Sequence, residues 1–297
     1  MSRTLPATAA LLAATAVWGS TFIITKDSLD ELDPASFLTW RFGIGAAALL
    51  LVRGATVARL TRSELRRSGL LGVALAGGFL LQTSGLQHTL AGVSGFLTGA
   101  AVILTPVVAA LVFTEQVGRA GWVAVALSTV GIAALAGGVG TPSVLGAALT
   151  LGGAACFAVH ITGLSQWATR ENAYGMTAVS VTVAAVLCAA CAMATERGIT
   201  VPATPDAWEA VLYLGIVATC IGFVVQAWAQ SALTATAAAV VMTMEPVFAA
   251  VLAAAVGEAG LGWAGWAGGL LVIAGMTLAE LGPRDCCDAM APRVECC

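Results

Sequence analysis

Charged side chains are scarce in this sequence of 297 residues, of which only 10% are Asp, Glu, Lys or Arg. An ordinary soluble domain carries about 25% charged residues. With 59% apolar residues, the chain cannot cover a water-facing surface, so a soluble globular protein is excluded and a membrane protein is indicated. The net charge of -3, from thirteen basic and sixteen acidic residues, offers no basic surface, so no nucleic-acid partner is predicted.

Lysine and histidine are nearly missing as well. Lys26 is the only lysine and lies in TFIITKDS, so the chain holds no GxxxxGK phosphate loop and ATP hydrolysis is excluded. The chain has two histidines and neither HExxH nor GxSxG. A membrane-embedded metal enzyme would need several converging ligands, so it is kept only as a distant alternative. No catalytic residue, cofactor or metal is predicted.

Long intervals without charge fill most of the chain. A helix needs about 20 apolar residues to cross the hydrocarbon layer, and the segments are continuously apolar rather than alternating, which disfavours a barrel. The intervals predict an all-α integral membrane protein with ten transmembrane helices, near residues 5–25, 35–52, 69–87, 93–113, 119–137, 144–166, 174–194, 208–229, 234–256 and 261–281.

The basic residues indicate an orientation for these helices. With the N-terminus inside, only Lys26, Arg41 and Arg197 fall on the outer side or in outer helix ends. The positive-inside rule therefore favours both termini in the cytoplasm of a multi-pass protein of the inner (plasma) membrane. The other ten basic residues then lie on the cytoplasmic side: Arg3, Arg53, Arg59, Arg62, Arg66, Arg67, Arg119, Arg170, Arg284 and Arg293.

The chain contains an internal repeat at an offset of 140 residues. LTPVVAALV at 104–112 reappears as MEPVFAAVL at 244–252, which pairs Pro106 with Pro246. At the same offset, the segment at 11–26 overlays that at 151–166, so the first segment is counted as a helix of the repeat rather than as a secretory signal. Because each unit holds five helices, the second copy must enter the membrane upside down, as in the inverted repeats of secondary transporters.

Several motifs carry a resemblance to a known family. WGSTFIITK, PxxFxxWRF, LTPVVAAL and EPVFAAVLAAAVGE resemble the EamA family of the drug/metabolite transporter superfamily, from about residue 10 to 281. The resemblance implies a ten-helix exporter or facilitator of small metabolites with a central cavity between the halves. The predicted units are a first EamA-like repeat at 1–140, a second, inverted repeat at 141–283 and a cysteine-containing cytoplasmic tail at 284–297.

Glu245 is the only carboxylate expected well inside a predicted helix. A buried ionisable group in hydrocarbon costs several kcal/mol unless it is paired or protonated, so it is a functional candidate. Two interpretations stay open: it binds substrate and couples transport to a proton or cation, or its protonated form bonds backbone groups freed beside Pro246. Its repeat partner is Thr105, so a charge here is asymmetric.

Other polar and aromatic residues are candidates for substrate binding. His160 overlays Ser20 at the repeat offset, and Trp18 lies deeper than an interfacial belt residue. Gln226 and Gln230, four residues apart, share one helix face. For each candidate the alternative is ordinary helix packing or helix-to-helix hydrogen bonding. The predicted substrate-binding set is Trp18, Ser20, Gln82, His88, His160, Gln226, Trp228 and Glu245.

The remaining features have plainer interpretations. Pro106 and Pro246 are expected to be hinges that kink paired helices. Arg41 either extends outward toward Asp33 or meets an anionic group in the cavity, and the first is the more common behaviour. Of the eight cysteines, four lie in predicted helices, where they behave as small apolar residues, and four lie in the tail.

The sequence thus predicts a secondary transporter, an exporter of amino acids or drug-like amphipathic compounds that works by alternating access between two inverted repeats. Its partners are a small-molecule substrate, the lipid bilayer and a coupling proton or cation. The alternative is an uncoupled facilitator. Substrate identity, direction and oligomeric state are not specified by the sequence.

Overall fold

The computed structural model describes residues 4–89, 91–114, 117–136, 143–255 and 263–281, and over these residues every regular element is a helix. In chain order the elements are α1 Thr4–Ser28, α2 Pro34–Arg53, η1 Gly54–Arg59, α3 Arg62–Leu86, α4 Ala91–Thr98, α5 Ala101–Phe113, α6 Arg119–Ala136, α7 Val144–Trp167, α8 Ala173–Met193, α9 Pro205–Tyr213, η2 Leu214–Ile221, α10 Gly222–Gln230, α11 Ala235–Met242, α12 Met244–Ala255 and α13 Trp263–Leu281.

The helices have the length and composition of membrane spans. Within the described residues, seven helical stretches are long and apolar enough to cross a bilayer, and three shorter apolar helices lie at Arg119–Ala134, Ala235–Ala249 and Trp266–Gly275. Each of the predicted segments coincides with one helix or with consecutive helices. The protein is therefore an all-helical, multi-pass membrane protein.

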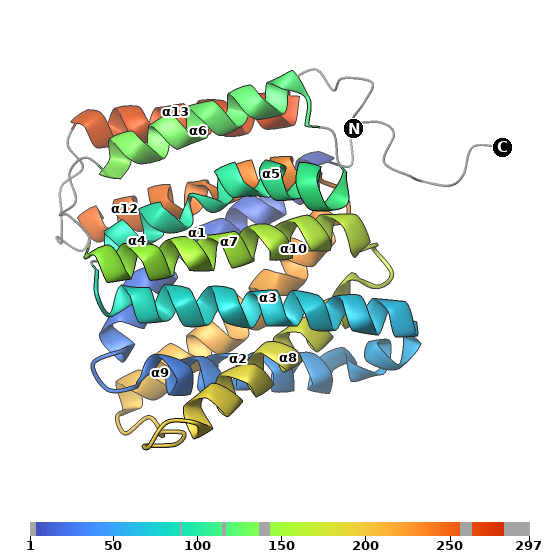
Figure 1. Ribbon diagram of the computed structural model, residues 1–297, viewed down its shortest axis with the longest axis vertical. Coiled ribbons are helices and arrows are strands. Elements are labelled where there is room, and N and C mark those ends of the chain that lie inside the picture. The colour runs from blue at the N-terminus through green and yellow to red at the C-terminus, as the bar shows by residue number, and fades with distance from the viewer. Residues whose placement is uncertain (1–3, 90, 115–116, 137–142, 256–262, 282–297) are drawn as a thin grey trace.

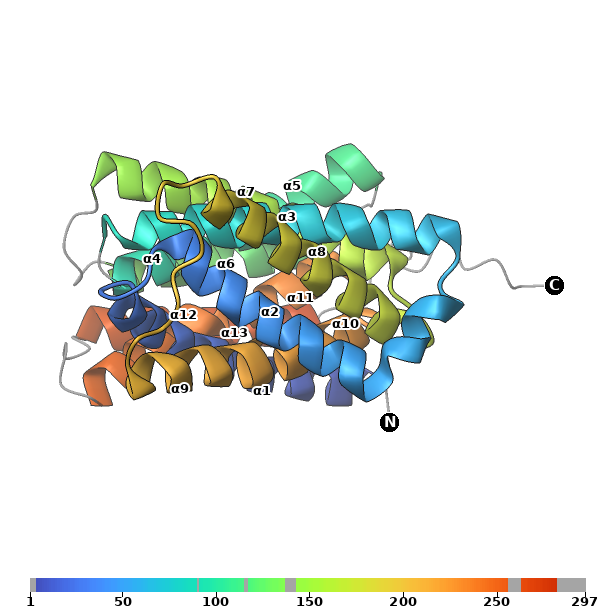
Figure 2. The same ribbon diagram turned by 90° about the horizontal axis from the view of Figure 1, so that it is seen from below.

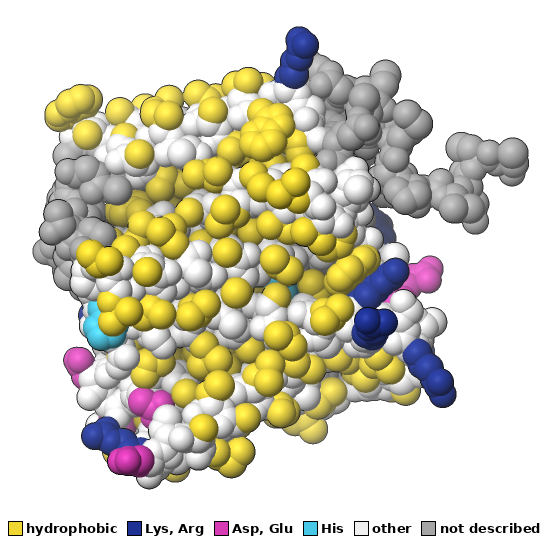
Figure 3. All heavy atoms as spheres, viewed as in Figure 1, with side chains coloured by type: hydrophobic (Ala, Val, Ile, Leu, Met, Phe, Trp, Pro, Cys, Tyr) yellow, Lys and Arg dark blue, Asp and Glu magenta, His cyan; other side chains and the backbone are white. Residues whose placement is uncertain are grey.

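The helices run side by side along one direction and form a bundle (Figure 1). α6 and α13 pair at one edge, α2, α8 and α9 lie at the opposite edge, and α1, α5, α7 and α10 lie between them (Figures 1 and 2). On the face drawn in Figure 3, hydrophobic side chains cover the middle of the bundle and charged side chains gather at its two ends. A lipid-facing belt between two polar rims has this distribution.

Hydrogen bonds between loops and helix ends define the two ends of the bundle. At the first end, which we call the Lys26 end, the Lys26 ammonium at the end of α1 donates to the carbonyl of Leu86 at the end of α3. Gly146, in the first turn of α7, lies against the backbone of Gly85 at the same end. At the second, the Asn172 end, the Asn172 side chain before α8 donates to the Glu64 carboxylate at the start of α3. α1 therefore ends where α7 begins, so these two helices run in opposite directions.

Three of the long segments are not regular α-helices. The fourth is broken between α4 and α5 at residues 99–100, and the ninth is broken between α11 and α12 at Thr243. The eighth passes from α9 through the π-helical η2 into α10. The helix α5 continues through Pro106, whereas Pro246 lies in the first turn of α12, where a missing N–H is tolerated.

Two glycines, Gly131 in α6 and Gly275 in α13, allow these helices to pack closely. A Cβ at Gly131 would lie 2.6 Å from the carbonyl oxygen of Gly268, and a Cβ at Gly275 would lie 2.5 Å from the hydroxyl of Ser128. Both positions therefore require glycine for this approach of the two backbones.

Candidate functional site

A cavity lies in the middle of the bundle. Its volume is about 70 Å³, which leaves room for several waters or for part of a small solute. Helices of both halves of the chain form its wall, including α1 to α5 from the first half and α7, α10, α11 and α12 from the second. Five of the eight predicted binding residues line it: Trp18, Gln82, His160, Gln226 and Glu245.

Two residues of opposite charge face this cavity. Glu245 comes from the first turn of α12, and Arg41 comes from the middle of α2. Arg41 is only 2% exposed; its Nε donates to the hydroxyl of Thr219 at 3.1 Å, and its guanidinium carbon lies 4.6 Å from the ring centre of Phe79. Burying a charge costs several kcal/mol unless polar or aromatic groups compensate, so these contacts help to hold Arg41 in place.

The Arg41 side chain therefore lines the cavity and bonds to Thr219 instead of extending outward toward Asp33. The Asp33 carboxylate instead caps the N-terminus of α2, accepting hydrogen bonds from the backbone N–H groups of Ala35 and Ser36 at 3.0 Å. The charge of Arg41 is thus available to the cavity.

Trp18 joins α1 to the π-helical segment of the eighth predicted span. Its indole Nε1 donates to the carbonyl oxygen of Ala218 at 2.8 Å, and its ring packs 5.5 Å from that of Phe223. A π-helical turn shifts the register of the residues that follow, and such turns are frequent at functional sites. Here η2 supplies both the carbonyl that holds Trp18 and the hydroxyl of Thr219 that holds Arg41.

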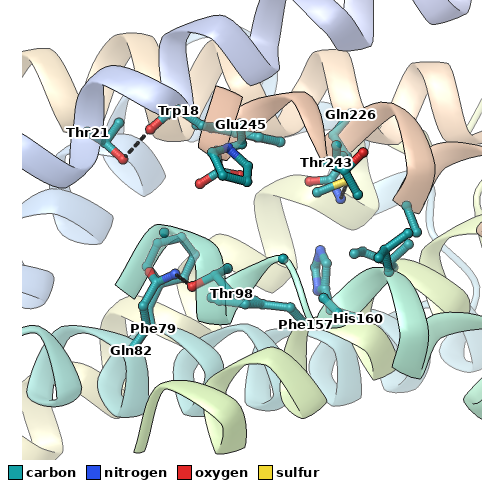
Figure 4. Close-up of a pocket in the computed structure, with 18 of the residues that line it drawn as sticks. Trp18, Thr21, Phe79, Gln82, Thr98, Phe157, His160, Gln226, Thr243 and Glu245 are labelled. Atoms are coloured by element: carbon teal, nitrogen blue, oxygen red, sulfur yellow. Dashed lines mark hydrogen bonds between the residues drawn. The ribbon is translucent and has the colours of Figure 1, made fainter. Parts of the chain in front are cut away.

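Backbone carbonyl groups orient the amide and imidazole side chains of the cavity. His160 Nδ1 lies 3.1 Å from the carbonyl oxygen of Leu71, which can only accept, so Nδ1 carries the proton. Gln230 Nε2 donates to the carbonyl of Ile161, so its Oε1 accepts from Gln226 Nε2 at 2.8 Å. Figure 4 shows His160 and Gln226 on facing walls of the cavity.

Gln82 lies on the same wall as His160 and bonds to α4. Its Nε2 donates to the hydroxyl of Thr98 at 2.8 Å, and that hydroxyl donates to the carbonyl of Ser94 (Figure 4). The glutamine is thus held beside the break between α4 and α5, with its Oε1 bound to nothing in the described part of the chain.

The other three predicted binding residues lie apart from the cavity. The Ser20 hydroxyl donates to the carbonyl of Val17 and lies 3.0 Å from the Tyr213 hydroxyl. His88 is exposed beyond the end of α3, and Trp228 packs against a hydrophobic cluster that includes Leu233. Ser20 and His160 align in the sequence repeat, but only His160 lines the cavity.

The two predicted hinges are also placed differently. Pro246 lines the cavity next to Glu245, whereas Pro106 is buried inside α5 and does not line it. Thr105, the repeat partner of Glu245, is buried as well, and its hydroxyl has no hydrogen-bond partner among the described residues.

Sequence reasoning missed the aromatic part of the wall. Phe79 lies at its centre, with ring centroids 5.0 Å from Phe157, 5.1 Å from Phe42 and 6.1 Å from Phe223. In an apolar segment a phenylalanine gives no signal of which way it faces, so only the tertiary structure identifies these rings. They make a wall suited to an apolar or flat part of a solute.

Metal ligands do not cluster in the described residues. No group of three or more His, Cys, Asp or Glu side chains that could hold a metal ion occurs within them. The helix cysteines Cys156, Cys188, Cys191 and Cys220 are free thiols, and the cysteines of the tail lie outside the described residues.

Loops at the Lys26 end connect the two halves outside the cavity. The Glu31 carboxylate accepts hydrogen bonds from the backbone N–H of Ala203 and from the hydroxyl of Thr204. Ser36 and Trp40 bond to the backbone of Thr200. The loop before α2 and the loop before α9 are thus held together and cover this end of the bundle.

Comparisons with known proteins agree with this architecture. The model of the EamA-like transporter family matches residues 5–137 and again residues 144–280. A curated relative, described as an uncharacterized transporter of Archaeoglobus fulgidus, is 29% identical over 240 residues, covering 81% of this chain and 74% of the relative. A protein of known crystal structure aligns with a TM-score of 0.75 at 22% identity, over 92% of this chain and 96% of the other, which shows a shared fold. The chain belongs to the EamA-like transporter family.

Proposed function

We propose that the protein is a secondary transporter that exports small amphipathic metabolites by alternating access between two inverted five-helix repeats. The observation that carries this proposal is the central cavity, whose wall is built by both halves and holds one acidic and one basic side chain among aromatic rings. Such a site at the interface of repeats is where secondary transporters bind substrate.

Several features support the inverted repeat and the count of ten spans. The family model matches each half separately, and α1 and α7, the first helices of the two halves, run in opposite directions. The segments that the repeat pairs as fourth and ninth helices are both broken, at residues 99–100 and at Thr243. Domain limits of 1–140 and 141–283 follow from the same pairing.

The arginines support a cytoplasmic Asn172 end. Arg53 ends α2 and Arg62 begins α3 at this end, and Phe113 at the end of α5 lies 5.4 Å from the ring of Trp167, which brings Arg119 to the same end. Under the positive-inside rule, this distribution supports cytoplasmic positions for both termini. Reporter tags on the two termini test this topology, because tags on opposite faces of the membrane would exclude an even number of spans.

Glu245 is the residue that we assign to ion coupling. A carboxylate in a cavity within the membrane can take up and release a proton or bind a cation as the halves move. A second candidate, an uncoupled facilitator, is favoured by Arg41, which lines the same cavity and provides a permanent counter-charge for Glu245.

A metabolite-efflux screen tests the function. Cells that overexpress the chain are expected to release one class of small solute faster than cells that express Glu245→Gln, while Glu209→Gln, on an exposed part of α9, serves as the matched control. In proteoliposomes, flux of the solute so identified should lose its dependence on a proton gradient in Glu245→Gln. Unchanged gradient dependence would remove Glu245 from coupling, and gradient-independent flux in the unaltered protein would favour the facilitator.

A further inference from the structure

The uncharged polar side chains of the cavity share an unusual property: most of their hydrogen-bond donors are already used. The Trp18 indole N–H is bound to Ala218, and His160 Nδ1–H is bound to Leu71. The hydroxyl groups of the lining threonines donate in the same way to carbonyls of their own helices, at 2.8, 2.9 and 2.5 Å: Thr21 to Trp18, Thr98 to Ser94 and Thr243 to Val240.

Two acceptors among the cavity side chains have no donor in the described part of the chain. Because His160 Nδ1 holds the proton of the neutral ring, Nε2 keeps a lone pair, and no hydrogen bond reaches it from the described residues. Because Gln226 Nε2 donates to Gln230, Gln226 Oε1 is an acceptor; it is buried and has no partner within the described chain. A buried acceptor is more stable when it receives a hydrogen bond, so this atom can accept one from a bound solute.

Hydrogen bonds to backbone carbonyl groups determine the amide orientation of Gln226 and the tautomer of His160. The Ile161 carbonyl fixes the Gln230 amide, which fixes Gln226, and the Leu71 carbonyl fixes the histidine tautomer. The acceptors come from opposite walls, Gln226 from α10 and His160 from α7, as Figure 4 shows. Glu245 adds a carboxylate to the same cavity.

The remaining donors lie on two side chains, Arg41 and Gln82. Arg41 donates its Nε–H to Thr219 and lies over the ring of Phe79, so the N–H groups of its terminal nitrogens remain available to a solute. Gln82 keeps its second N–H as a further donor. A solute that brings N–H groups can satisfy the acceptors on Gln226, His160 and Glu245, which a solute that brings only acceptors cannot do.

Resting on the proposed function, we propose that the transported solute carries a primary or secondary ammonium group, which donates hydrogen bonds to Gln226 Oε1 and His160 Nε2 while Glu245 balances its charge. The apolar body of the solute lies against Phe79, Phe157 and Phe223. The class of substrate is thus a small amphipathic amine, recognised by its N–H donors as well as by its charge.

A methylation series on the unaltered full chain tests this recognition. The probes are 2-phenylethylamine, its N,N,N-trimethyl analogue and 3-phenylpropionate, and binding is measured by calorimetry on the purified protein in detergent. All three carry the same ring, the first two share the charge, and only the first can donate. We expect the primary amine to bind at least tenfold more tightly than each of the others.

Variants then assign the preference to residues. Gln226→Leu and His160→Phe are expected to reduce the preference for the primary over the quaternary amine to less than threefold, while Gln87→Leu, on an exposed glutamine beyond α3, retains it. If a variant does not fold, the methylation series on the unaltered chain decides by itself.

Three outcomes overturn the proposal. Equal affinities for the primary and quaternary amines would mean that the cavity recognises the positive charge alone. Tighter binding of the carboxylate would make Arg41 the main recognition group, and binding of none of the probes would exclude the amine class. Each leaves the transporter assignment standing, which fails instead if the efflux screen detects no exported solute.

Discussion

The indole of Trp18 and the backbone of Ala218 are joined by a hydrogen bond of 2.8 Å that links the first helix of the chain to the π-helical segment η2, 200 residues later. The bond holds one wall of the cavity against another. Because the acceptor is a backbone carbonyl and the donor a rigid indole, the relative position of α1 and η2 is tightly defined.

Replacing Trp18 by Phe removes this bond but keeps an aromatic ring against Phe223. We expect a loss of about 1–3 kcal/mol in the free energy of unfolding, because the Ala218 carbonyl is left without its donor. Thermal unfolding in detergent measures the effect, and Trp263→Phe, on a side chain that is 85% exposed, is the control. Equal melting temperatures for the two variants would contradict a structural role for the bond.

The pairing of α6 with α13 depends on Gly131 and Gly275. A methyl group at either position meets atoms closer than 3 Å, so Gly131→Ala and Gly275→Ala should each destabilise the protein by about 1–3 kcal/mol. Gly69→Ala in α3 is the matched control, since its new methyl would meet nothing within 4 Å. The melting temperatures of the three variants measure these losses of stability. If Gly69→Ala lowered the melting temperature as much as the other two substitutions, the close approach of α6 and α13 would not be the cause of the destabilisation.

The loops at the Lys26 end should separate in acid. Hydrogen bonds from the Ala203 amide and then the Thr204 hydroxyl hold the pKa of Glu31 below its ordinary value of 4.5. The connection is therefore fully present above that value and is lost as the pH falls through the lowered pKa. Hydrogen exchange of residues 199–204, corrected for the intrinsic rate, should rise over this range.

In Glu31→Gln the same exchange should be faster already at neutral pH and should depend little on acid, because the neutral amide accepts these hydrogen bonds more weakly than a carboxylate and does not titrate. Asp30→Asn, on an exposed neighbour, is expected to behave as the unaltered chain. Protection of residues 199–204 that stays high in Glu31→Gln at neutral pH would disprove the connection.

Pro246 lies in the first turn of α12, three residues after the break at Thr243, and its missing N–H removes a hydrogen bond that would help to join α11 and α12 into one helix. Pro246→Ala should therefore slow transport without lowering stability, because the hinge becomes stiffer. Counterflow rates and melting temperatures are to be compared with those of Pro106→Ala, which lies within α5 and away from the cavity. An unaltered rate in Pro246→Ala would mean that the break does not move during transport.

Composition allowed the positions of the helices to be predicted, but not their irregularities. Hydropathy over a window is the same for an α-helix, a π-helix and a broken helix, so the break at 99–100 and the π-helical η2 left no signal, whereas Pro246 did indicate an irregularity close to the break at Thr243. Polar residues in apolar segments did indicate the cavity, as Gln226, His160 and Glu245 illustrate. The inward direction of Arg41 was not predictable, because it depends on Thr219, which only the register of η2 brings into reach.

Glu245 has no acidic counterpart, since the corresponding residue in the first half is the buried Thr105. If the two halves exchanged conformations during transport, the inward-open and outward-open states would have equal energy only if the halves were chemically identical. In the proposed alternating-access cycle, the carboxylate would stay on one side of the axis that relates the two repeats, so the two end states would differ in the surroundings of that charge. We therefore expect the resting protein to favour one opening, and a solute or proton that neutralises Glu245 to change that preference.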